Sequence, residues 1–452
     1  MKHVFITLIF LFNYITLIAQ PICQIKHYSV NEGMSQGIAV DIMQDKKGFL
    51  WFSTWNGLNK FDGYSFKSYK TSQKDSYILN TNRLSKISET KSGDIWCQTY
   101  DKRIYLFDTQ TEQFIDILSP LEKSMKQNFY TKRTYNLKKG ITWVTLENGS
   151  ALRIDEQICK EGKGITLYST INKNLKGDQI QAIFEDSEGD EWILTDKGIS
   201  IIGKKQIDTN LTFQFLKEIN EKIYLISQAD KIGIYDMQTQ KLQLTEIPYH
   251  TSNIRDVRTV MSNMLAFATE NGLILYNPLK GEFQLVDVRT PSQPSNNIQA
   301  IYQDKNQELW IFPNTFGVIR YNLSTHEKQH LFTPASEAIK YERKSKNLIF
   351  EDLQGMLWIL PPEGNLSYYD RKEKRLKPFL MDINDPKSIY SPLVRVYMLD
   401  KQGNCWLGST RGVEKISFFP QTYTLNSIDQ GFETRALFCD REKRLWAASK
   451  AQ

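Results

Sequence analysis

The feature that most constrains this chain is a short phrase that returns at intervals of about 45 residues. It is complete in DKKGFLWFSTWNGLNKFDG, residues 45–63, where an Asp lies six residues before a Trp, a Gly three before it and a second Gly six after it. Eight of the nine tryptophans share this register, and Tyr224 and Ala266 take the Trp position in two degenerate copies. The ten register positions are residues 51, 96, 143, 192, 224, 266, 310, 358, 406 and 446.

Each copy has the pattern of four short strands. In the first copy the segments IAVDIMQD, FLWFST, GLNKFDG and SFKSY are separated by turn residues, and no sustained helical periodicity competes with them. In the Asp-x-x-Gly turn we expect Asp to accept hydrogen bonds from turn amides and Gly to supply a positive φ. We expect the Trp to point into the layer between neighbouring units. These residues are therefore predicted to be structural and not catalytic.

One such unit cannot bury both of its faces, so the pattern predicts an all-β protein whose units stack radially as a β-propeller. We expect a seven-bladed β-propeller of four-stranded antiparallel blades over residues 24–335, followed by the first blades of a second, incomplete propeller over residues 336–452. Residues 25–30, IKHYSV, precede the first copy and are expected to close the ring as an outer strand of its last blade. Closure one or two copies later fits the same pattern. The last copy stops after its second strand, which suggests a truncated gene product or an excerpt.

The first twenty residues differ from the rest. MKHVFITLIFLFNYITLIAQ has one early Lys and then an apolar run that is short for a membrane span, so we predict a signal peptide over residues 1–20 and export to the periplasm. An uncleaved anchor is the alternative. We expect no membrane span after this segment.

The charges and cysteines argue against other classes of protein. The net charge is +6, and the densest basic run, residues 371–375, contains its own Glu373, so we predict a solvated turn and no contact with nucleic acid. The five cysteines include no C-x-x-C pair, which indicates isolated buried thiols in preference to a disulfide framework or a cysteine-based zinc site.

The segment GMSQGIAVDIMQDKKGFLWFSTWNGLNKFDGYSFKSY, residues 33–69, resembles the two-component regulator propeller repeat, as does the opening HYSVNEGMSQ. That repeat fills the periplasmic sensor region of Bacteroides-type hybrid two-component systems. The resemblance implies that the chain senses a glycan fragment or other small ligand for a histidine kinase. It also implies a homodimer and an inner-membrane anchor supplied by parts that this sequence lacks. The kinase is absent as well, so we expect this chain not to be an enzyme, and the family offers no ligand motif to carry over.

Strand alternation indicates where a ligand would bind. The turns between second and third strands and the long connections between copies, such as residues 70–82, 168–178 and 285–297, are expected on one face, where binding usually resides. Exposed aromatic rings beside carboxylates and amides suit sugars, stacking on a ring face and bonding hydroxyls. The candidate ligand-binding residues are Trp55, Tyr100, Asp101, Asp196 and Asn314. Trp55 is the one Trp outside the register, and packing against a neighbouring loop is its alternative role.

The segment HEKQH, His326–His330, matches the zinc-protease pattern H-E-x-x-H. The pattern needs a helix, whereas here it falls in a turn and outer strand, where histidines four residues apart are separated by roughly 13 Å. We therefore predict no catalytic residue, no metal site and no cofactor. The remaining alternatives to a ligand sensor are a protein-interaction scaffold and, as a third class, a propeller lyase or hydrolase.

Overall fold

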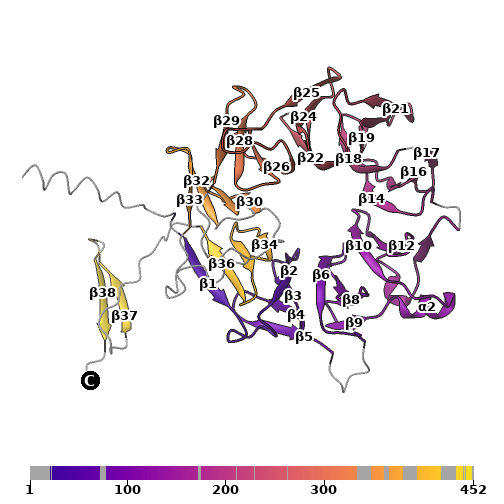
Figure 1. Cartoon of the computed structure of the whole chain (residues 1–452). Coiled ribbons are helices and arrows are strands. Elements are labelled where there is room, and N and C mark those ends of the chain that lie inside the picture. Colours follow the sequence, from indigo (N-terminus) through magenta and orange to yellow (C-terminus); the bar gives the residue numbers. More distant parts are fainter. Residues whose placement is uncertain are drawn as a thin grey trace, which may run out of the picture. The chain divides into compact units, whose positions relative to one another are not determined.

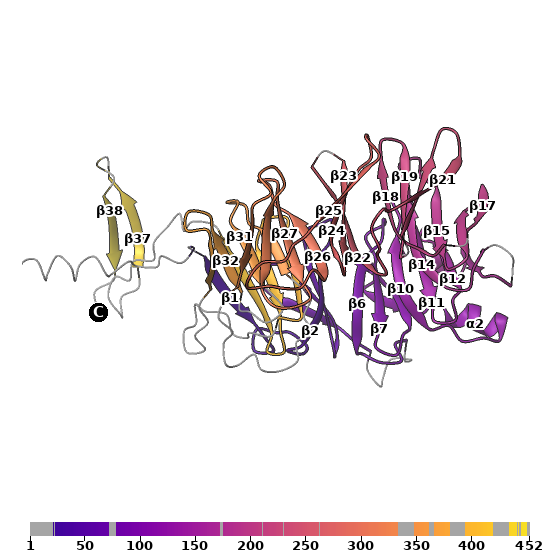
Figure 2. The same cartoon turned by 45° about the horizontal axis from the view of Figure 1, so that its top comes forward.

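The computed structural model describes residues 21, 23–71, 78–171, 175–209, 211–228, 230–261, 263–332, 348–360, 366–379, 394–418, 434–440, 442 and 444–449. The chain divides into two compact units, of which one is Gln24–Ser417. This unit is a ring of nine four-stranded antiparallel sheets, or blades (Figure 1). The turned view shows the same blades standing side by side (Figure 2).

The blades follow one another along the chain. The first three comprise β2 (Ala39–Gln44), β3 (Leu50–Thr54), β4 (Gly57–Phe61) and β5 (Phe66–Tyr69); β6 (Leu84–Glu89), β7 (Ile95–Thr99), β8 (Ile104–Asp108) and β9 (Gln113–Ile115); and β10 (Thr131–Asn136), β11 (Ile141–Leu146), β12 (Ala151–Asp155) and β13 (Ile165–Tyr168). The next three comprise β14 (Ile180–Glu185), β15 (Glu191–Thr195), β16 (Gly198–Ile201) and β17 (Lys205–Asp208); β18 (Phe213–Ile219), β19 (Lys222–Ser227), β20 (Lys231–Asp236) and β21 (Lys241–Glu246); and β22 (Ile254–Val260), β23 (Met264–Thr269), β24 (Gly272–Asn277) and β25 (Glu282–Val286).

The last three blades comprise β26 (Ile298–Gln303), β27 (Glu308–Pro313), β28 (Val318–Asn322) and β29 (Lys328–Leu331); β30 (Leu348–Glu351), β31 (Leu357–Leu360), β32 (Ser367–Asp370) and β33 (Arg375–Pro378); and β34 (Val396–Leu399), β35 (Cys405–Gly408) and β36 (Val413–Ser417) with β1 (Gln24–Tyr28). A short helix α2 (Ser119–Met125) precedes the third blade, and the 3-10 turn η1 (Cys159–Glu161) connects β12 to β13 within it. Outside the ring, β37 (Thr434–Cys439) and β38 (Leu445–Ser449) form a two-stranded hairpin.

The expected seven-bladed ring with an incomplete second propeller is wrong, because the structure has nine blades in one ring. Strand β1 takes the outer position predicted for residues 25–30, but in the ninth blade, where it pairs antiparallel with β36 from Gln24↔Ser417 to Tyr28↔Val413. The ring thus continues through the segment that the sequence pattern assigned to a second propeller. Only the hairpin β37–β38 carries a copy outside the ring among the described residues.

The junction between the ninth and first blades has contacts equivalent to those between the first and second blades. The amide of Lys46 in the first blade donates to Glu89 of the second at 3.0 Å, and the amide of Lys401 in the ninth donates to Gln44 of the first at 2.7 Å. The two lysine ammonium groups also donate to a main-chain carbonyl of the next turn, at 3.1 and 2.8 Å. We call this pair of contacts the blade junction. Its repetition shows that the ninth and first blades meet as consecutive blades do.

All ten register residues lie in the second strand of a copy, as predicted, and those of the ring are buried. Trp51 packs in one cluster with Ile87 and Phe107 of the next blade, and Trp406 of the ninth blade packs with Phe52 of the first. Each large ring therefore fills the layer between two blades, where it buries roughly 150–250 Å².

The turn aspartates have a second partner that the sequence pattern did not predict. In Asp45 one carboxylate oxygen accepts from the amide of Phe49 at 2.9 Å, and the other accepts from the Trp51 indole at 2.8 Å. The same indole bond joins the pairs Asp186–Trp192, Asp304–Trp310, Asp352–Trp358, Asp400–Trp406 and Asp440–Trp446, at 2.8 to 3.0 Å. A separation of six residues is thus fixed by two hydrogen bonds from one side chain.

The innermost strands share an irregularity. In β2, Ala39 pairs with Thr54 and Asp41 with Ser53, which leaves Val40 as an extra residue. The same register shift occurs in β6, β10, β14, β18, β22, β26 and β37. Such a β-bulge bends a strand and turns an additional side chain toward one face. In the blades of the ring that strand borders the central opening, whereas β37 belongs to the separate hairpin.

The cysteines are unpaired, as predicted. Cys97, Cys159 and Cys405 are buried, whereas Cys23 is half-buried and Cys439 is exposed. The basic run at 371–375 lies partly in a turn, but Arg371 is not simply solvated: it forms ion pairs with Asp304 at 3.0 Å and Glu308 at 3.3 Å of the preceding blade.

Candidate functional site

One face of the ring carries the turns between second and third strands together with the connections that lead into the next blade. We call it the loop face. It is defined by the residues four positions after each register residue: Trp55, Tyr100, Glu147, Asp196, Gln228, Glu270, Asn314 and Thr410. Four of the five predicted ligand-binding residues, all but Asp101, hold this position. The sequence prediction thus selected equivalent positions of different blades.

The loop face is built from the same local bond in several blades. The turn amide donates to the carbonyl of the residue directly before the innermost strand: Tyr100 to Arg83 at 2.8 Å, Glu147 to Tyr130 at 2.9 Å, Asp196 to Gln179 at 3.0 Å and Asn314 to Asn297 at 2.7 Å. This bond ties each turn to the connection beside it. The side chains on the loop face therefore stand on a fixed backbone.

Trp55 and Tyr100 meet at one point of the loop face, through a residue that the sequence prediction missed. The guanidinium of Arg83 lies over both rings, with its carbon 4.6 Å from the Trp55 ring centre and 5.0 Å from the Tyr100 ring centre. Tyr100 is 66% exposed, and Arg83 is also exposed. We call these three residues the aromatic–arginine cluster. Arg83 has a recognisable place in the sequence: it is a cation directly before an innermost strand, and it lies between the turns that hold Trp55 and Tyr100.

The other predicted residues do not join this cluster through any contact of their own. Asp101 follows Tyr100 but its carboxylate accepts from the hydroxyl of Thr99. Asp196 lies in the fourth blade, where its carboxylate accepts from the Gln179 amide at 3.0 Å and so holds the connection. Asn314 lies in the seventh blade and is exposed. The structure therefore brings two of the five candidates together and distributes the rest around the ring.

Several carboxylates of the loop face are kept ionised by their neighbours. A hydrogen bond from Lys102 lowers the pKa of Glu147, with the two groups 2.9 Å apart. Hydrogen bonds from Thr170 and Lys197 lower the pKa of Asp178. These groups carry negative charge at neutral pH but are already paired with local donors.

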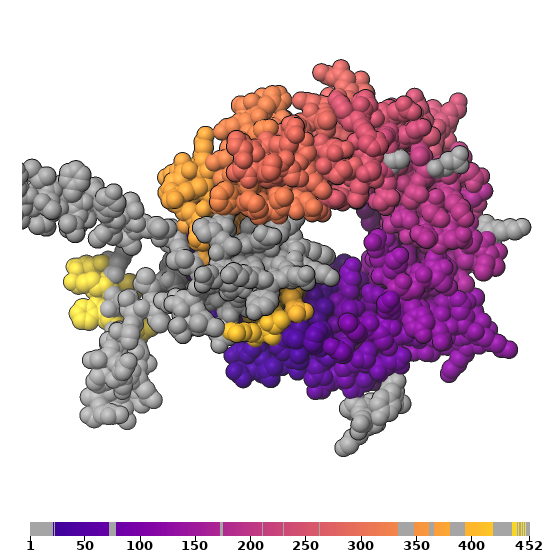
Figure 3. Space-filling model, viewed as in Figure 1, coloured from indigo at the N-terminus to yellow at the C-terminus, as the bar shows by residue number. Residues whose placement is uncertain are grey.

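A pocket of about 440 Å³ lies against the innermost strands of the first, second, eighth and ninth blades. Its lining includes Asp41, Lys86, Arg395 and Tyr397. Asp41 accepts from the Ile87 amide of the next blade at 3.0 Å, so part of its hydrogen-bonding capacity is used. The space-filling view shows the ring hollowed at its centre (Figure 3). The pocket combines two cations and the Asp41 carboxylate with apolar strand side chains.

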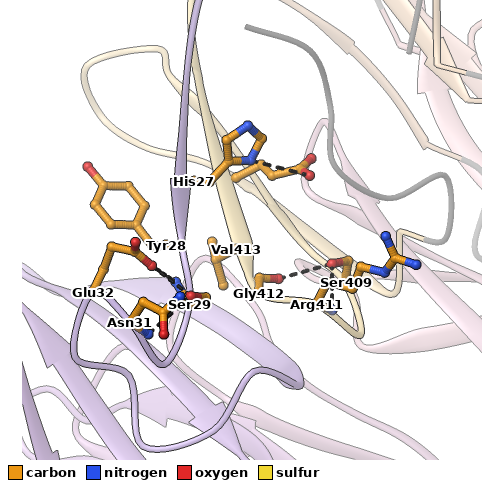
Figure 4. Close-up of a pocket in the computed structure, with 10 residues that line it drawn as sticks. His27, Tyr28, Ser29, Asn31, Glu32, Ser409, Arg411, Gly412 and Val413 are labelled. Atoms are coloured by element: carbon orange, nitrogen blue, oxygen red, sulfur yellow. Dashed lines mark hydrogen bonds and ion pairs between the residues drawn. The ribbon is translucent and has the colours of Figure 1, made fainter. Parts of the chain in front are cut away.

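A second pocket, of about 310 Å³, lies where the ring closes (Figure 4). His27 on β1 faces Glu414 on β36, with His27 Nδ1 3.8 Å from the carboxylate. Ser29 donates to Glu32 through its amide at 2.6 Å and through its hydroxyl at 2.7 Å. The hydrogen bond from the Ser29 hydroxyl lowers the pKa of Glu32. The groups in this pocket mainly hold the closing strand and the loop that follows it.

The zinc-protease pattern is not on a helix. His326 occupies a turn and has a positive φ of 58°, while His330 lies in β29. Their ring nitrogens contact Tyr321 at 2.8 Å, and Ser292 and the Phe316 carbonyl at 2.9 and 3.0 Å. Within the described ranges no group of three or more His, Cys, Asp or Glu side chains is placed to hold a metal ion. The same ranges contain no helix with the length and apolar character required to cross a bilayer.

Comparison with known proteins gives matches by sequence and by fold. Residues 292–313 match the family model described as Two component regulator propeller. Over 78 residues the chain is 42% identical to Histidine kinase P4 of Formosa agariphila, an alignment that covers 17% of this chain and 6% of that protein. The chain thus spans a small fraction of the length of the curated relative that it matches.

Solved structures with similar arrangements include the extracellular domain assigned to a hybrid two component system of B. thetaiotaomicron, with 16% identity, a TM-score of 0.38 and coverage of 95% of this chain and 71% of that one. They also include virginiamycin B lyase from Staphylococcus aureus, with 11% identity, a TM-score of 0.37 and coverage of 88% and 99%. At these identities and TM-scores the likenesses do not bear on function. Residues 292–313 are therefore similar to the two-component regulator propeller repeat, and the same phrase recurs along the chain in ten copies.

Proposed function

We propose that this chain is the periplasmic ligand-sensing portion of a hybrid two-component sensor histidine kinase, and that its ligand is an oligosaccharide. The observation that carries this proposal is the aromatic–arginine cluster on the loop face of a chain with two-component regulator propeller repeats. The half-buried Trp55 and the exposed Tyr100 on a fixed backbone are suited to an amphipathic ligand such as a sugar, which presents both apolar faces and hydroxyl groups.

The proposed role is binding without turnover. On the loop face the Ser292 hydroxyl lies 2.9 Å from His330 Nδ1, but the other ring nitrogen of His330 contacts the Phe316 carbonyl at 3.0 Å, so no carboxylate of the described residues orients this pair as in a hydrolase triad. The predicted signal peptide at residues 1–20 lies outside the described residues, and export to the periplasm is part of the proposal. Transmission of the signal is assigned to the kinase portion of the full sensor, for which a homodimer is proposed.

The test is calorimetric titration of the purified chain, without residues 1–20, against a library of oligosaccharides. We expect at least one to bind saturably, and Trp55→Ala and Tyr100→Ala to weaken that binding about tenfold, since each removes a contact worth on the order of 1 kcal/mol. Tyr64→Ala is the matched control, because Tyr64 is 96% exposed but lies in the turn between β4 and β5, on the opposite face. It should leave the affinity unchanged.

Three results would contradict the proposal. Binding to proteins but to no oligosaccharide would favour an interaction scaffold. Conversion of the oligosaccharide, measured by chromatography after incubation, would make the chain an enzyme. Equal loss of affinity in the Tyr64→Ala control would remove the loop face as the binding surface.

A further inference from the structure

The chemistry of the ligand can be inferred from Arg83, and this inference rests on the proposed function. Its guanidinium contacts the faces of Trp55 and Tyr100 and has neither a hydrogen bond nor an ion pair within the described residues. A guanidinium is planar and carries its five N–H donors at the edge. Stacking on two rings orients the plane and leaves that edge without an acceptor.

Arg83 also changes what the two aromatic rings are able to do. The face of each ring that Arg83 covers is not available to a sugar, so simple stacking of a sugar between Trp55 and Tyr100 is excluded on those faces. In place of a stacking surface, the cluster offers the parallel N–H donors of the Arg83 guanidinium, which the two rings hold in position. Such a fork matches the two oxygens of a carboxylate or a sulfate.

The surroundings favour negative charge in the ligand. Lys70, Arg83 and Lys86 have no ion pair within the part of the chain that the structure describes. Lys70 directly follows β5, with its Cβ next to Gly57 in the turn that holds Trp55. Lys86 lies three residues after Arg83 and lines the 440 Å³ pocket together with Arg395.

The nearby acids offset only part of this charge. Glu147 is paired with Lys102 at 2.9 Å, whereas Asp41 and Asp101 keep their negative charge, because the Ile87 amide and the Thr99 hydroxyl that donate to them are neutral. The three cations Lys70, Arg83 and Lys86 outnumber these two carboxylates, so the local balance is positive. A positive patch with an oriented fork attracts and orients an oxyanion more strongly than it does a neutral hydroxyl.

We propose that the aromatic–arginine cluster binds the anionic group of an acidic oligosaccharide, a carboxylate or a sulfate ester, with Arg83 as its principal contact. Trp55 and Tyr100 hold the guanidinium plane and are positioning residues for it. Lys70 and Lys86 add long-range attraction. The ligand class of the sensor is thereby narrowed from oligosaccharides in general to those that carry charge.

The experiment compares matched pairs of probes on the full chain without residues 1–20. One pair is tri-galacturonate and its methyl ester, and the other is a sulfated galactose disaccharide and its desulfated form. We expect the charged member of at least one pair to bind about tenfold more tightly than its neutral form, because a hydrogen bond to a charged group is the stronger contact. Which pair shows the preference distinguishes a carboxylate from a sulfate.

Substitutions at Arg83 assign the preference to the cluster. Arg83→Gln should bring the affinity ratio of charged to neutral probe close to one, and Arg83→Lys should restore part of it, since the charge returns without the planar fork. Lys47→Gln is the control, because Lys47 is exposed in the turn between β2 and β3 on the opposite face, and it should retain the ratio. Circular dichroism confirms that each variant is folded.

The outcomes separate this inference from the proposed function. Equal binding of charged and neutral probes, or an unchanged ratio in Arg83→Gln, overturns the inference and leaves sugar binding intact. If no probe binds, sulfate alone is titrated while the melting temperature is followed. A sulfate-dependent shift that Arg83→Gln reduces relative to the parent supports the anion site and overturns only the sugar, whereas equal shifts in the two proteins overturn both.

Discussion

At the residue scale, one Asp carboxylate accepts two structural hydrogen bonds in most of the repeat turns. In Asp45 one oxygen closes the turn through the Phe49 amide and the other fixes the Trp51 indole between two blades. The ring of Trp51 is 1% exposed, so water cannot replace the carboxylate. Where the turn lacks an Asp, the indole turns to the next blade: Trp96 donates to Thr142 at 2.9 Å and Trp143 to Glu191 at 2.6 Å.

Asp45→Ala is expected to destabilise the ring by about 2–3 kcal/mol, because it leaves a buried indole N–H and a turn amide without their acceptor. Urea unfolding followed by tryptophan fluorescence measures the loss. Asp440→Ala removes the equivalent bonds in the hairpin β37–β38, where Trp446 is 57% exposed and water is able to take the place of the carboxylate. A similar loss in both variants would contradict this account.

A second residue-scale prediction concerns acid. Burial opposes ionisation of Asp108, but Lys160 at 2.6 Å and the amides of Thr111 and Gln110 outweigh it and lower the pKa of Asp108 from 3.8 to about 2. Because the folded pKa is depressed, the resulting stability is present above about pH 4 and is lost as the pH falls toward 2. The contribution is about 2 kcal/mol.

The test is urea unfolding of the parent and Asp108→Asn from pH 7 to pH 2. The parent should be more stable by a constant amount at neutral pH, and the difference should shrink between pH 4 and pH 2. In the Lys160→Met background, Asp108→Asn should change the stability by an amount that varies less with pH over the same range. The reason is that the cation that lowers the pKa of Asp108 has been removed. A difference that stays constant down to pH 2 would show that Asp108 has an ordinary pKa.

At the element scale, the strand that closes the ring decides the number of blades. Strand β1 is five residues long and places Lys26 opposite Lys415 on β36. Nothing in IKHYSV indicates whether this outer strand pairs with the third strand of a seventh blade or with that of a ninth. The third strands of the blades present similar edges for pairing. The sequence therefore predicted the role of the closing strand but not its partner.

Lys26→Cys combined with Lys415→Cys should form a disulfide on mild oxidation, since directly paired residues on antiparallel strands have neighbouring Cβ atoms. Peptide mass spectrometry identifies the linked pair against the background of the five native cysteines. Lys26→Cys with Lys328→Cys is the control, because Lys328 lies in β29, the outer strand of the seventh blade. A link to residue 328 in place of 415 would restore the seven-bladed ring.

The sequence predicted the place of two aromatic candidates in the fold but not the cation between them. Trp55 and Tyr100 were identifiable because the register places them on one face of adjacent copies. Arg83 was missed because its role depends on how two turns and a connection meet in space, which a pattern of separate strands does not encode. Asp196 stays a prediction, and its carboxylate also accepts from the Gln179 amide. The bulges of the innermost strands also leave no trace in the alternation of apolar residues.

At the scale of the whole molecule, blade shape was predictable and blade number was not. The residues around Trp51 specify a turn, a buried indole ring and a contact with the next blade. All of these features lie within one copy of the repeat and the copy that follows it. The number of copies that fit in a circle depends on the small rotation between blades, to which all nine junctions contribute. No residue of the repeat indicates the size of that rotation.

A chain ending at residue 418 should therefore fold with the same melting temperature as the full chain, because the unit Gln24–Ser417 contains every strand of the ring. A chain ending at residue 332 retains seven complete blades but loses the eighth, the ninth and the partner of β1. It should aggregate or melt at a much lower temperature, since an open ring exposes strand edges and apolar blade faces. Differential scanning calorimetry and size-exclusion chromatography measure both. Equal stability of the two shorter chains would contradict closure at nine.

The repeated blade junction affects how the number of repeat copies can change in evolution. Lys46 and Lys401 make equivalent contacts although one joins consecutive copies and the other joins the two ends of the circle. An unequal crossover that added or removed one copy of the gene segment would thus create no unfamiliar interface, only a slightly wider or narrower circle. A lineage built on such a module can change its copy number in a single step and then adapt the exposed loops one at a time.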